Sequence, residues 1–324
     1  MSLPTPEQVS IVIAAYNAEA TLERCLRSLL ALAHPAREIL VVDNNSRDAT
    51  AAIVRRYEGV GGIRYLYEPQ RGWPAARNAG IAAARCPYVA NIDADCAADP
   101  QWLDTLLRAF TGERVGCVVG RTLVEPGTTW AQRFYARSDP FCIEGKIGTT
   151  PFVPWGGGNN VMRRDVFLRA GGYDAARFTS GADAEFHYRL EKQFGYCTKY
   201  EPRAIIYHRA RGSLRELFAV SAKYAHDGFL RACEPEMQET RQHYRYFLLR
   251  KLFDIGKHLA GMGVRSGRAA LGRGTWFDVA CNGFTVVCLC GTLAGYCRAR
   301  ARHLWRQWSG AGRPRRAQWS RSAW

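Results

Sequence analysis

Short apolar runs alternate with segments of helical periodicity through the first third of the chain. Three short apolar runs predict buried strands, over residues 9–15, 38–42 and 88–92, and a further strand is expected over residues 63–67. The segments between them predict helices, over residues 21–32, 49–57 and 75–84. Asp99 and Pro100 are typical of a further helix start, with Asp as the cap and Pro in the first turn. This alternation predicts βαβ units and a mostly parallel sheet in an α/β core over residues 5–125.

Beyond residue 120 the pattern becomes irregular and then helical. The glycine cluster Gly156-Gly157-Gly158 predicts loops and short strands built onto the sheet before residue 207. Ser213 and Glu216 form a capping box, which predicts a helix that runs to about Arg231. A further helix is expected over residues 240–259. The Gly- and Arg-rich residues 264–274 predict a linker.

The charge of the chain is strongly positive, with 45 Lys and Arg against 29 Asp and Glu and a net charge of +16. Such a surplus suggests a polyanionic partner, such as nucleic acid, anionic lipid or a phosphorylated ligand. Much of it lies near the C-terminus, because no acidic residue follows Asp278 and eight Arg follow Cys297. The surplus therefore says little about the body of the chain, and a basic nucleic-acid-binding protein stays an alternative.

The cysteines favour a reducing compartment. The chain has 11 of them, an odd number, without a CxxC pair, and most are typical of small buried apolar residues. Its first ten residues have neither the basic region nor the apolar region of a signal peptide. We therefore expect a cytoplasmic location.

Polar residues follow three of the predicted strands, at the edge where ligands bind in open α/β sheets. The first strand leads into Tyr16 and Asn17, the second into Asp43, and the fourth into Asp93 and Asp95. Acidic residues at strand ends often only cap turns, and for Asp43 this alternative stays open. Asp93 and Asp95 are one residue apart, so their carboxylates repel unless a cation lies between them. Oxygen ligands favour Mg²⁺ or Mn²⁺, whose remaining positions a nucleotide diphosphate usually fills.

The first strand-to-helix turn excludes two common nucleotide-binding classes. It reads AAYNAEA and has no glycine, whereas a dinucleotide-binding dehydrogenase needs GxGxxG at this place. The chain also lacks the GxxxxGK[ST] motif of P-loop enzymes. A nucleotidyltransferase of the α/β class remains an alternative enzyme, although this turn lacks the Gly-rich phosphate loop usual for that class.

A series of motifs in the chain resembles family 2 glycosyltransferases of the GT-A fold over about residues 8–210. The motifs are VSIVIAAYNAEATLERCLRSLL, VVDNNSRDAT, RGWPAARNAGI, NIDADC, GGGNNVMRRDVFLRAGGYDAA and SGADAEFHYRL. The resemblance implies a Rossmann-like sheet flanked by helices, to which this chain adds a C-terminal helical extension. It also implies a nucleotide-sugar donor and Mg²⁺ or Mn²⁺ as cofactor.

The resemblance implies a nucleotide-sugar site. Asp43 matches the family's Asp that hydrogen-bonds the base, and the loop that packs against the base contains Ala15, Tyr16 and Asn17. The family's Arg-Asn segment, at the floor of the nucleotide pocket, is matched by Arg77 and Asn78. Asn44 stands where Asp is more usual in the family, and we expect this change to alter the polarity of the donor site and its base preference.

The resemblance also implies metal ligands and a catalytic base. Asp93 and Asp95 match the DxD pair, whose carboxylates reach the ribose and the divalent ion. Asp183 matches the base, with Glu185 as the next candidate. Ala182 replaces the family's Glu beside Asp183, which removes a source of like-charge repulsion. His208 is a further metal or diphosphate candidate, and a surface or core histidine is the alternative.

Other polar and aromatic residues near these motifs are open to two interpretations. Arg209 and Arg211 could contact the diphosphate or lie in solvent. Trp155 precedes the glycine cluster and could form a platform for a sugar or belong to the core.

The reaction that fits these residues is transfer with inversion. An acceptor hydroxyl attacks the anomeric carbon while a carboxylate removes its proton, and the nucleoside diphosphate leaves. A retaining mechanism would call for a nucleophile on the other face of the sugar, and the sequence offers no candidate. We expect a UDP-, TDP- or GDP-sugar as the donor.

Residues 279–296 are 18 residues without a charge, at the lower limit for a membrane span. Arg flanks both ends of this stretch, so a single span would leave one basic flank outside. A helix lying on the inner leaflet keeps both flanks at anionic lipid, and Trp305 and Trp308 suit that interface. We expect peripheral association with the inner face of the membrane. A spanning helix and a soluble packing helix are the alternatives.

The expected organisation has three parts. Residues 1–212 form the catalytic domain, with a nucleotide-sugar half over 8–125 and an acceptor half over 126–212. Residues 213–274 form a helical extension, and residues 275–324 form the apolar segment with a poorly ordered Arg- and Trp-rich tail. Membrane placement suggests an acceptor that is itself a membrane-linked glycan or glycolipid. The resemblance implies that residues 134–146 lie where family members vary their acceptor contacts, so we expect these residues to meet the acceptor.

Overall fold

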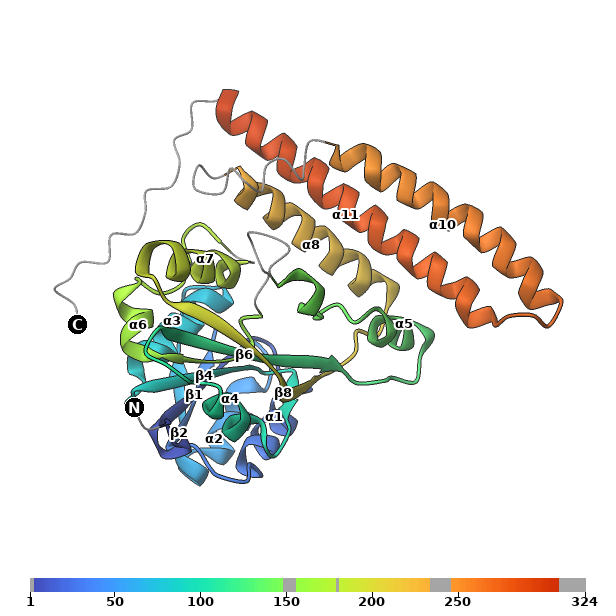
Figure 1. Cartoon of the computed structure of the whole chain (residues 1–324). Coiled ribbons are helices and arrows are strands. Elements are labelled where there is room, and N and C mark those ends of the chain that lie inside the picture. The colour runs from blue at the N-terminus through green and yellow to red at the C-terminus, as the bar shows by residue number, and fades with distance from the viewer. Residues whose placement is uncertain (1–2, 148–155, 179–180, 234–245, 309–324) are drawn as a thin grey trace. The chain divides into compact units, whose positions relative to one another are not determined.

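The computed structural model describes residues 3–147, 156–178, 181–233 and 246–308, which form two compact units. The first unit contains residues 3–123 and Phe141–Arg209. The second contains Val124–Pro140 and the described residues from Ala210 onward. Each unit is described separately below and is drawn in Figure 1.

The first unit is built on one eight-stranded sheet with the order β3-β2-β1-β4-β7-β6-β8-β5. The strands are β1 (Val9–Ala15), β2 (Glu38–Asp43), β3 (Ile63–Tyr67), β4 (Tyr88–Asp93), β5 (Cys96–Ala98), β6 (Val115–Val124), β7 (Asn159–Arg163) and β8 (Cys197–His208). The first four predicted strands are β1 to β4, and these pair in parallel, as expected. The rest of the sheet departs from the mostly parallel expectation, because β7 is antiparallel to both β4 and β6, and β5 is antiparallel to β8.

Helices cover both faces of this sheet. One core cluster includes residues of α1 (Leu22–Leu30), α2 (Thr50–Tyr57) and α4 (Trp102–Arg108). The other includes residues of α3 (Trp73–Ala83), α6 (Arg164–Arg169) and α7 (Ala182–Phe194). The short 3₁₀ helices are η1 (Pro6–Gln8), η2 (Val60–Gly62) and η3 (Glu144–Lys146). The continuous apolar strands β1 and β2 are buried on both faces, as parallel strands between helix layers require.

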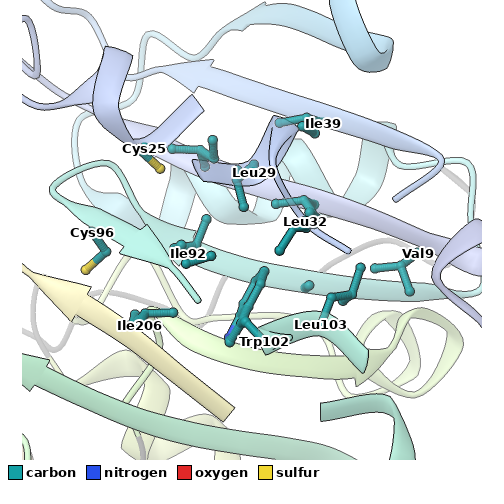
Figure 2. Close-up of a cluster of buried hydrophobic side chains, with 14 of the residues drawn as sticks. Val9, Cys25, Leu29, Leu32, Ile39, Ile92, Cys96, Trp102, Leu103 and Ile206 are labelled. Atoms are coloured by element: carbon teal, nitrogen blue, oxygen red, sulfur yellow. The ribbon is translucent and has the colours of Figure 1, made fainter. Parts of the chain in front are cut away.

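Figure 2 shows the first of these clusters, in which Trp102 lies among Val9, Ile92, Leu103 and other apolar side chains. The Trp102 side chain is fully buried, and its indole N–H donates to Asn159 Oδ1 over 2.7 Å. The indole therefore buries a large apolar area and its polar atom is satisfied. This contact fixes α4 to β7, the strand that follows the Gly156–Gly158 turn.

The second unit is helical and contains α5 (Trp130–Ser138), α8 (Leu214–Ala232), α10 (Phe247–Ala270) and α11 (Trp276–Trp308). α11 lies between α8 and α10 and packs against both. Gly291 and Gly295 face the α8 backbone at Phe218 and Ala222, where an added Cβ would overlap a carbonyl oxygen. These two glycines let α8 and α11 approach closely.

Two expectations for the C-terminal residues are wrong. Residues 264–270, predicted as part of a linker, continue α10 without a break. Residues 297–308, expected to be poorly ordered, complete α11. Packing against a neighbouring helix offsets the cost of glycine in a helix, which is only about 1 kcal/mol per residue. The rest of the tail, residues 309–324, lies outside the described residues, as do residues 240–245 of the helix predicted after α8.

Candidate functional site

The carboxyl ends of three adjacent strands place the predicted site residues at one edge of the sheet. In the β1–β2 pairing Ala15 is opposite Asp43, and in the β1–β4 pairing Ala14 is opposite Asp93. Because these registers align the three strand ends, the turns after them open at the same level. The structure therefore brings together the residues predicted from sequence for the nucleotide and for the metal.

Asp43 is held by hydrogen bonds from two other segments. Its carboxylate is almost fully buried and accepts from the Ser46 N–H and from the Tyr65 hydroxyl, each over 3.0 Å. Burial and the hydrogen bond to Asp43 raise the pKa of Tyr65 to about 12, so the phenol stays a donor at neutral pH. Asp43 also caps a turn, as the alternative interpretation expected, because its hydrogen bond from the Ser46 N–H closes the turn after β2. No pattern in the sequence signals the bond from Tyr65.

Tyr16 presents an exposed ring beside this carboxylate. Its side chain is 47% exposed, and the Arg71 guanidinium lies 4.4 Å from the ring centroid. Asn17 follows with a φ of 47°, a left-handed conformation that Asn tolerates. Its amide oxygen accepts from the Arg47 N–H over 2.9 Å, which joins the turn after β1 to the turn after β2. A planar ligand such as a base could stack on the free area of the Tyr16 ring.

The Asn44 side chain makes three hydrogen bonds to the loop between β3 and α3. Its amide nitrogen donates to the carbonyl oxygens of Glu68 and Gln70, and its amide oxygen accepts from the Gly72 N–H. An aspartate at this place could not donate to either carbonyl. Asn44 therefore holds the β3–α3 loop, and its expected effect on base preference stays a prediction.

The side chains of Arg77 and Asn78, which are neighbours in α3, contact different partners. The Arg77 guanidinium is buried, pairs with the Asp93 carboxylate and lies 4.6 Å from the Trp73 ring centroid. The Asn78 amide donates to the Tyr173 carbonyl over 2.8 Å and accepts from the Tyr173 N–H over 3.0 Å. Arg77 thus orients one carboxylate of the DxD pair. Asn78 attaches the chain near Tyr173 to α3, and nucleotide binding by either residue stays a prediction.

The glycine turn before β7 lies directly on this cluster. A Cβ on Gly157 would overlap the Arg77 guanidinium, and a Cβ on Gly158 would overlap the Asp93 carboxylate. Gly156, by contrast, has open space where a Cβ would point. The glycine cluster noted in the sequence therefore lets the backbone approach two predicted site residues, Arg77 and Asp93, closely.

Asp183 is fixed by the same turn. Its Oδ2 accepts from the Gly157 N–H and its Oδ1 accepts from the Ala184 N–H, each over 2.9 Å. Asp183 lies in the first turn of α7, where the helix dipole favours a negative charge. Ala182 is fully buried, so the family's Glu would have to bury a carboxylate at this position.

Glu185, the second base candidate, is occupied elsewhere. Both of its carboxylate oxygens accept from the Arg189 guanidinium, over 2.8 and 2.9 Å. It lines a different cavity of about 570 Å³, beside α3, together with Asn78 and Asp174. The geometry therefore favours Asp183 over Glu185 as the base.

Asp95, Cys96 and His208 form the donor set of a candidate metal site. β5 pairs with the end of β8 so that Cys96 is opposite His208, and the ligand atoms of all three residues lie within 4.8 Å of one another. Burial raises the pKa of the Cys96 thiol, which donates toward Asp95, and this disfavours the thiolate form in which cysteine binds metals. The oxygen and nitrogen ligands that remain suit Mg²⁺ or Mn²⁺.

The surroundings of His208 restrict its protonation. Its Nδ1 lies 2.6 Å from the Arg209 carbonyl oxygen and therefore carries a proton, and its Nε2 lies 3.2 Å from Asp95 Oδ2. Two arrangements satisfy this geometry: a second proton on Nε2, or a cation shared by Nε2 and the carboxylate. The ring also packs on Phe141, with centroids 4.8 Å apart. The residues present therefore fit a divalent cation.

The side chains of the other candidates make different contacts or lie outside the described residues. Arg209 directs its guanidinium to the Ala20 carbonyl, at 3.5 Å. Arg211 belongs to the second unit and bonds the Tyr135 hydroxyl. Trp155 lies outside the described residues.

The Gly158→Ala substitution tests whether the close approach matters. The added methyl group would displace the Asp93 carboxylate and with it the Arg77 pair. We expect turnover to fall by about 10²-fold, because misplacing reacting groups by about 1 Å costs that much. Gly156→Ala, which adds the same methyl group into open space, should keep activity near that of the unmodified chain. Equal activity of the two variants in a steady-state assay would show that the turn has no such role.

The model of the family described as glycosyl transferase family 2 matches residues 10–177 of the chain. This match covers more than half of the chain, so the protein belongs to glycosyltransferase family 2. The family prediction is confirmed. The nucleotidyltransferase and nucleic-acid-binding alternatives are not supported.

Curated relatives are also glycosyltransferases. The chain is 33% identical over 132 residues to glycosyltransferase AglE of Haloferax volcanii, which covers 39% of this chain and 43% of the relative. It is 31% identical over 233 residues to the pre-mycofactocin glycosyltransferase of Mycobacterium tuberculosis. This alignment covers 68% of this chain and 47% of the relative. The aligned region thus spans less than half the length of these two relatives.

A solved structure confirms the fold. The mannosyltransferase PcManGT from Pyrobaculum calidifontis, solved with GDP-Man and Mn²⁺, has a TM-score of 0.60 to this chain at 17% sequence identity. The similarity covers 90% of this chain and 87% of the solved one. The predicted GT-A fold, including helices after the sheet, is therefore confirmed.

Proposed function

We propose that the chain transfers a sugar, with inversion at the anomeric carbon, from a nucleotide-diphosphate donor to an acceptor hydroxyl. The observation that carries this proposal is the single cluster formed by Asp93, Arg77, Asp183 and the Gly157–Gly158 backbone. It combines a carboxylate suited to proton removal with the first carboxylate of the DxD pair.

The donor side of the proposal is supported by the turns after β1 and β2. The exposed Tyr16 ring offers a stacking surface for a base, and the Asp43 carboxylate offers a hydrogen-bond acceptor beside it. The solved mannosyltransferase of the same fold, which holds GDP-Man, supports a donor of this type. We propose a UDP-, TDP- or GDP-sugar, bound through Ala15, Tyr16, Asn17 and Asp43 on the base side, and through Arg77, Asn78 and Asp93 toward the diphosphate.

The metal part of the proposal assigns Mg²⁺ or Mn²⁺ to Asp95, with Asp93 and His208 as further ligands. When bound, the ion would offset the negative charge that develops on the leaving nucleoside diphosphate. The chain prepares this site by fixing its ligands beforehand. Arg77 orients Asp93, and the Arg209 carbonyl sets the tautomer of His208 so that Nε2 faces Asp95.

The base in this proposal is Asp183. The Gly157 and Ala184 N–H groups fix the orientation of its side chain. One of its carboxylate oxygens removes the proton of the attacking hydroxyl. The buried Ala182 keeps a second negative charge away from the base.

The acceptor and location are inferred from the C-terminal half. We propose a glycan or lipid-linked acceptor, met in part by residues 134–146, and an enzyme that acts at the cytoplasmic face of the membrane. Residues 1–212 would form the catalytic domain and residues 213–324 its membrane-associated extension. The basic and apolar character of residues 246–308 supports this division.

The donor is tested by measuring release of nucleoside diphosphate from a panel of UDP-, TDP- and GDP-sugars in Mn²⁺ or Mg²⁺. We expect one donor class to be turned over far faster than the others once an acceptor lipid extract is added. Product stereochemistry, read by NMR, should show inversion at the anomeric carbon. Retention of configuration would contradict the proposed mechanism, and no turnover of any nucleotide sugar would contradict the donor class.

A further inference from the structure

The outward face of α10 is an exposed apolar surface that runs the length of the helix. No residue of α10 is buried. Its large apolar side chains that are exposed are Leu248, Leu249, Leu252, Phe253, Leu259 and Val264, with Leu271 just beyond the helix end. Phe253 and Leu271 are each 73% exposed. We call this set the outward face of α10. It is a continuous apolar stripe, which soluble helices normally bury.

The opposite side of α10 already has a partner within the same unit. His258 bonds Asn282 of α11 over 3.0 Å, and Phe247 packs on Tyr296 with ring centroids 4.8 Å apart. Gly261 also faces Asn282. These contacts fix the rotation of α10 about its axis, because they come from residues about half a turn away from the apolar stripe. The outward face is therefore left over after α10 has packed on α11.

Positive charges accompany this face. Residues 246–308 contain ten Lys and Arg but only Asp254 and Asp278 as acidic residues. Both acids are paired, Asp254 with Lys251 at 3.4 Å and Asp278 with Arg137 at 2.9 Å. Further cations are exposed and lie along one edge of the apolar stripe at helical spacing, namely Arg250, Lys257 and Arg268. An anionic surface complements this edge.

We propose that the outward face of α10 docks on an anionic lipid bilayer and lies in its interface. A straight apolar stripe with cations along its edge matches the boundary between acyl chains and anionic headgroups. A second copy of the chain is a poorer occupant, because two such faces would bring their cations together. Trp276, which is 56% exposed next to the end of α10, adds an aromatic side chain suited to the interface.

The surface is distinct from the apolar segment singled out in the sequence. α11 is, among the described residues, the helix long and apolar enough to cross a membrane. From Phe277 to Leu289, however, each of its residues is at least half-covered or buried, between α8 and α10. Gly291 and Gly295 lie against the α8 backbone, so a spanning α11 would have to take the charged α8 with it or lose these contacts. In this proposal α11 is a packed helix that supports α10, and α10 is the helix that binds the membrane.

This inference gives a physical basis to the lipid-linked acceptor proposed above, but it does not depend on catalysis. Its test measures binding of the full chain to vesicles by cosedimentation, without any nucleotide sugar. One set of vesicles contains phosphatidylcholine alone, and the other also contains phosphatidylglycerol. We expect binding to the second set, with release at high salt because the cations contribute through screened charges.

Phe253→Glu tests the apolar face, and Val60→Glu is its matched control. Val60 is an exposed apolar residue of the first unit, so the control adds the same charge at a site that the proposal does not use. We expect Phe253→Glu to weaken partitioning about tenfold or more, the factor that corresponds to losing the burial of one large apolar side chain. Val60→Glu should bind as the unmodified chain does.

Three outcomes would overturn the inference. The full chain could stay in the supernatant with anionic vesicles at low salt, the two variants could bind equally well, or light scattering could show a dimer that Phe253→Glu dissociates while binding to vesicles is unchanged. Circular dichroism checks that Phe253→Glu is folded, and Leu249→Gln, on the same face, replaces it if it is not. Loss of vesicle binding with intact donor turnover in detergent would separate this inference from the proposed reaction.

Discussion

Asp183→Asn should lower turnover by about 10²–10⁴-fold and leave donor binding unchanged, because the amide keeps the size of the carboxylate but cannot take the acceptor's proton. The oxygen of the introduced amide can still accept from the Gly157 N–H, so the turn before β7 should stay in place. Donor affinity measured by calorimetry and turnover measured by nucleoside diphosphate release separate the two effects.

The control for this substitution is Asp165→Asn. Asp165 is an exposed carboxylate in the same unit and pairs only weakly across the surface with Arg169 at 2.8 Å. Its replacement removes the same charge and should leave turnover within about twofold, as surface substitutions usually do. If Asp183→Asn retains the activity of this control, the base must lie elsewhere. Glu185→Gln, which weakens the ion pair with Arg189, is then the next variant to examine.

Asp95→Ala should abolish the dependence of donor binding on Mn²⁺ and reduce turnover by at least about 10²-fold, since a metal ion supplies several kcal/mol of charge stabilisation. The fold should persist, because the Asp95 side chain is 41% exposed and lies at the edge of the sheet. Calorimetry of UDP, TDP and GDP with and without Mn²⁺ measures the loss directly. The unmodified chain treated with a chelator should behave like the variant and recover when Mn²⁺ is returned.

A second variant separates the metal role of Asp95 from its contact with His208. His208→Gln keeps a polar side chain near Asp95 but removes the imidazole ligand, and should weaken metal-dependent donor binding less than Asp95→Ala does. Unchanged nucleotide affinity in Asp95→Ala, with and without Mn²⁺, would remove the metal from this site.

The parallel half of the fold could be predicted from the sequence because its signals are local. Each of β1 to β4 is a short, mainly apolar run, and each ends at a polar residue or leads into one. The antiparallel half could not be predicted in this way. β7 and β8 carry mixed patterns, and their order in the sheet depends on pairings between residues far apart in sequence, such as Ile92 with Asn159.

In the candidate site, too, the features that depend on neighbouring residues could be predicted, and those that depend on distant residues could not. The strand-end carboxylates could be located from sequence, but their partners could not. Tyr65 reaches Asp43 from the next strand, and His208 reaches Asp95 through the β5–β8 pairing. The glycine turn was visible as a run, yet its contact with Asp183 depends on residues 26 positions apart. The first half of α10 was predicted from sequence, but its extension to Ala270 was not, because glycine and arginine in residues 264–274 are also typical of a linker.

The three hydrogen bonds of Asn44 affect how the proposed nucleotide site responds to pH. The amide has no proton to gain or lose in the range where proteins stay folded, so its three bonds to the β3–α3 loop have the same strength at every such pH. An aspartate would give this loop a titrating contact, held only in one protonation state. The part of the loop geometry that Asn44 fixes is therefore independent of pH. A pH profile of turnover should then report the proposed base and metal ligands rather than the contacts of Asn44.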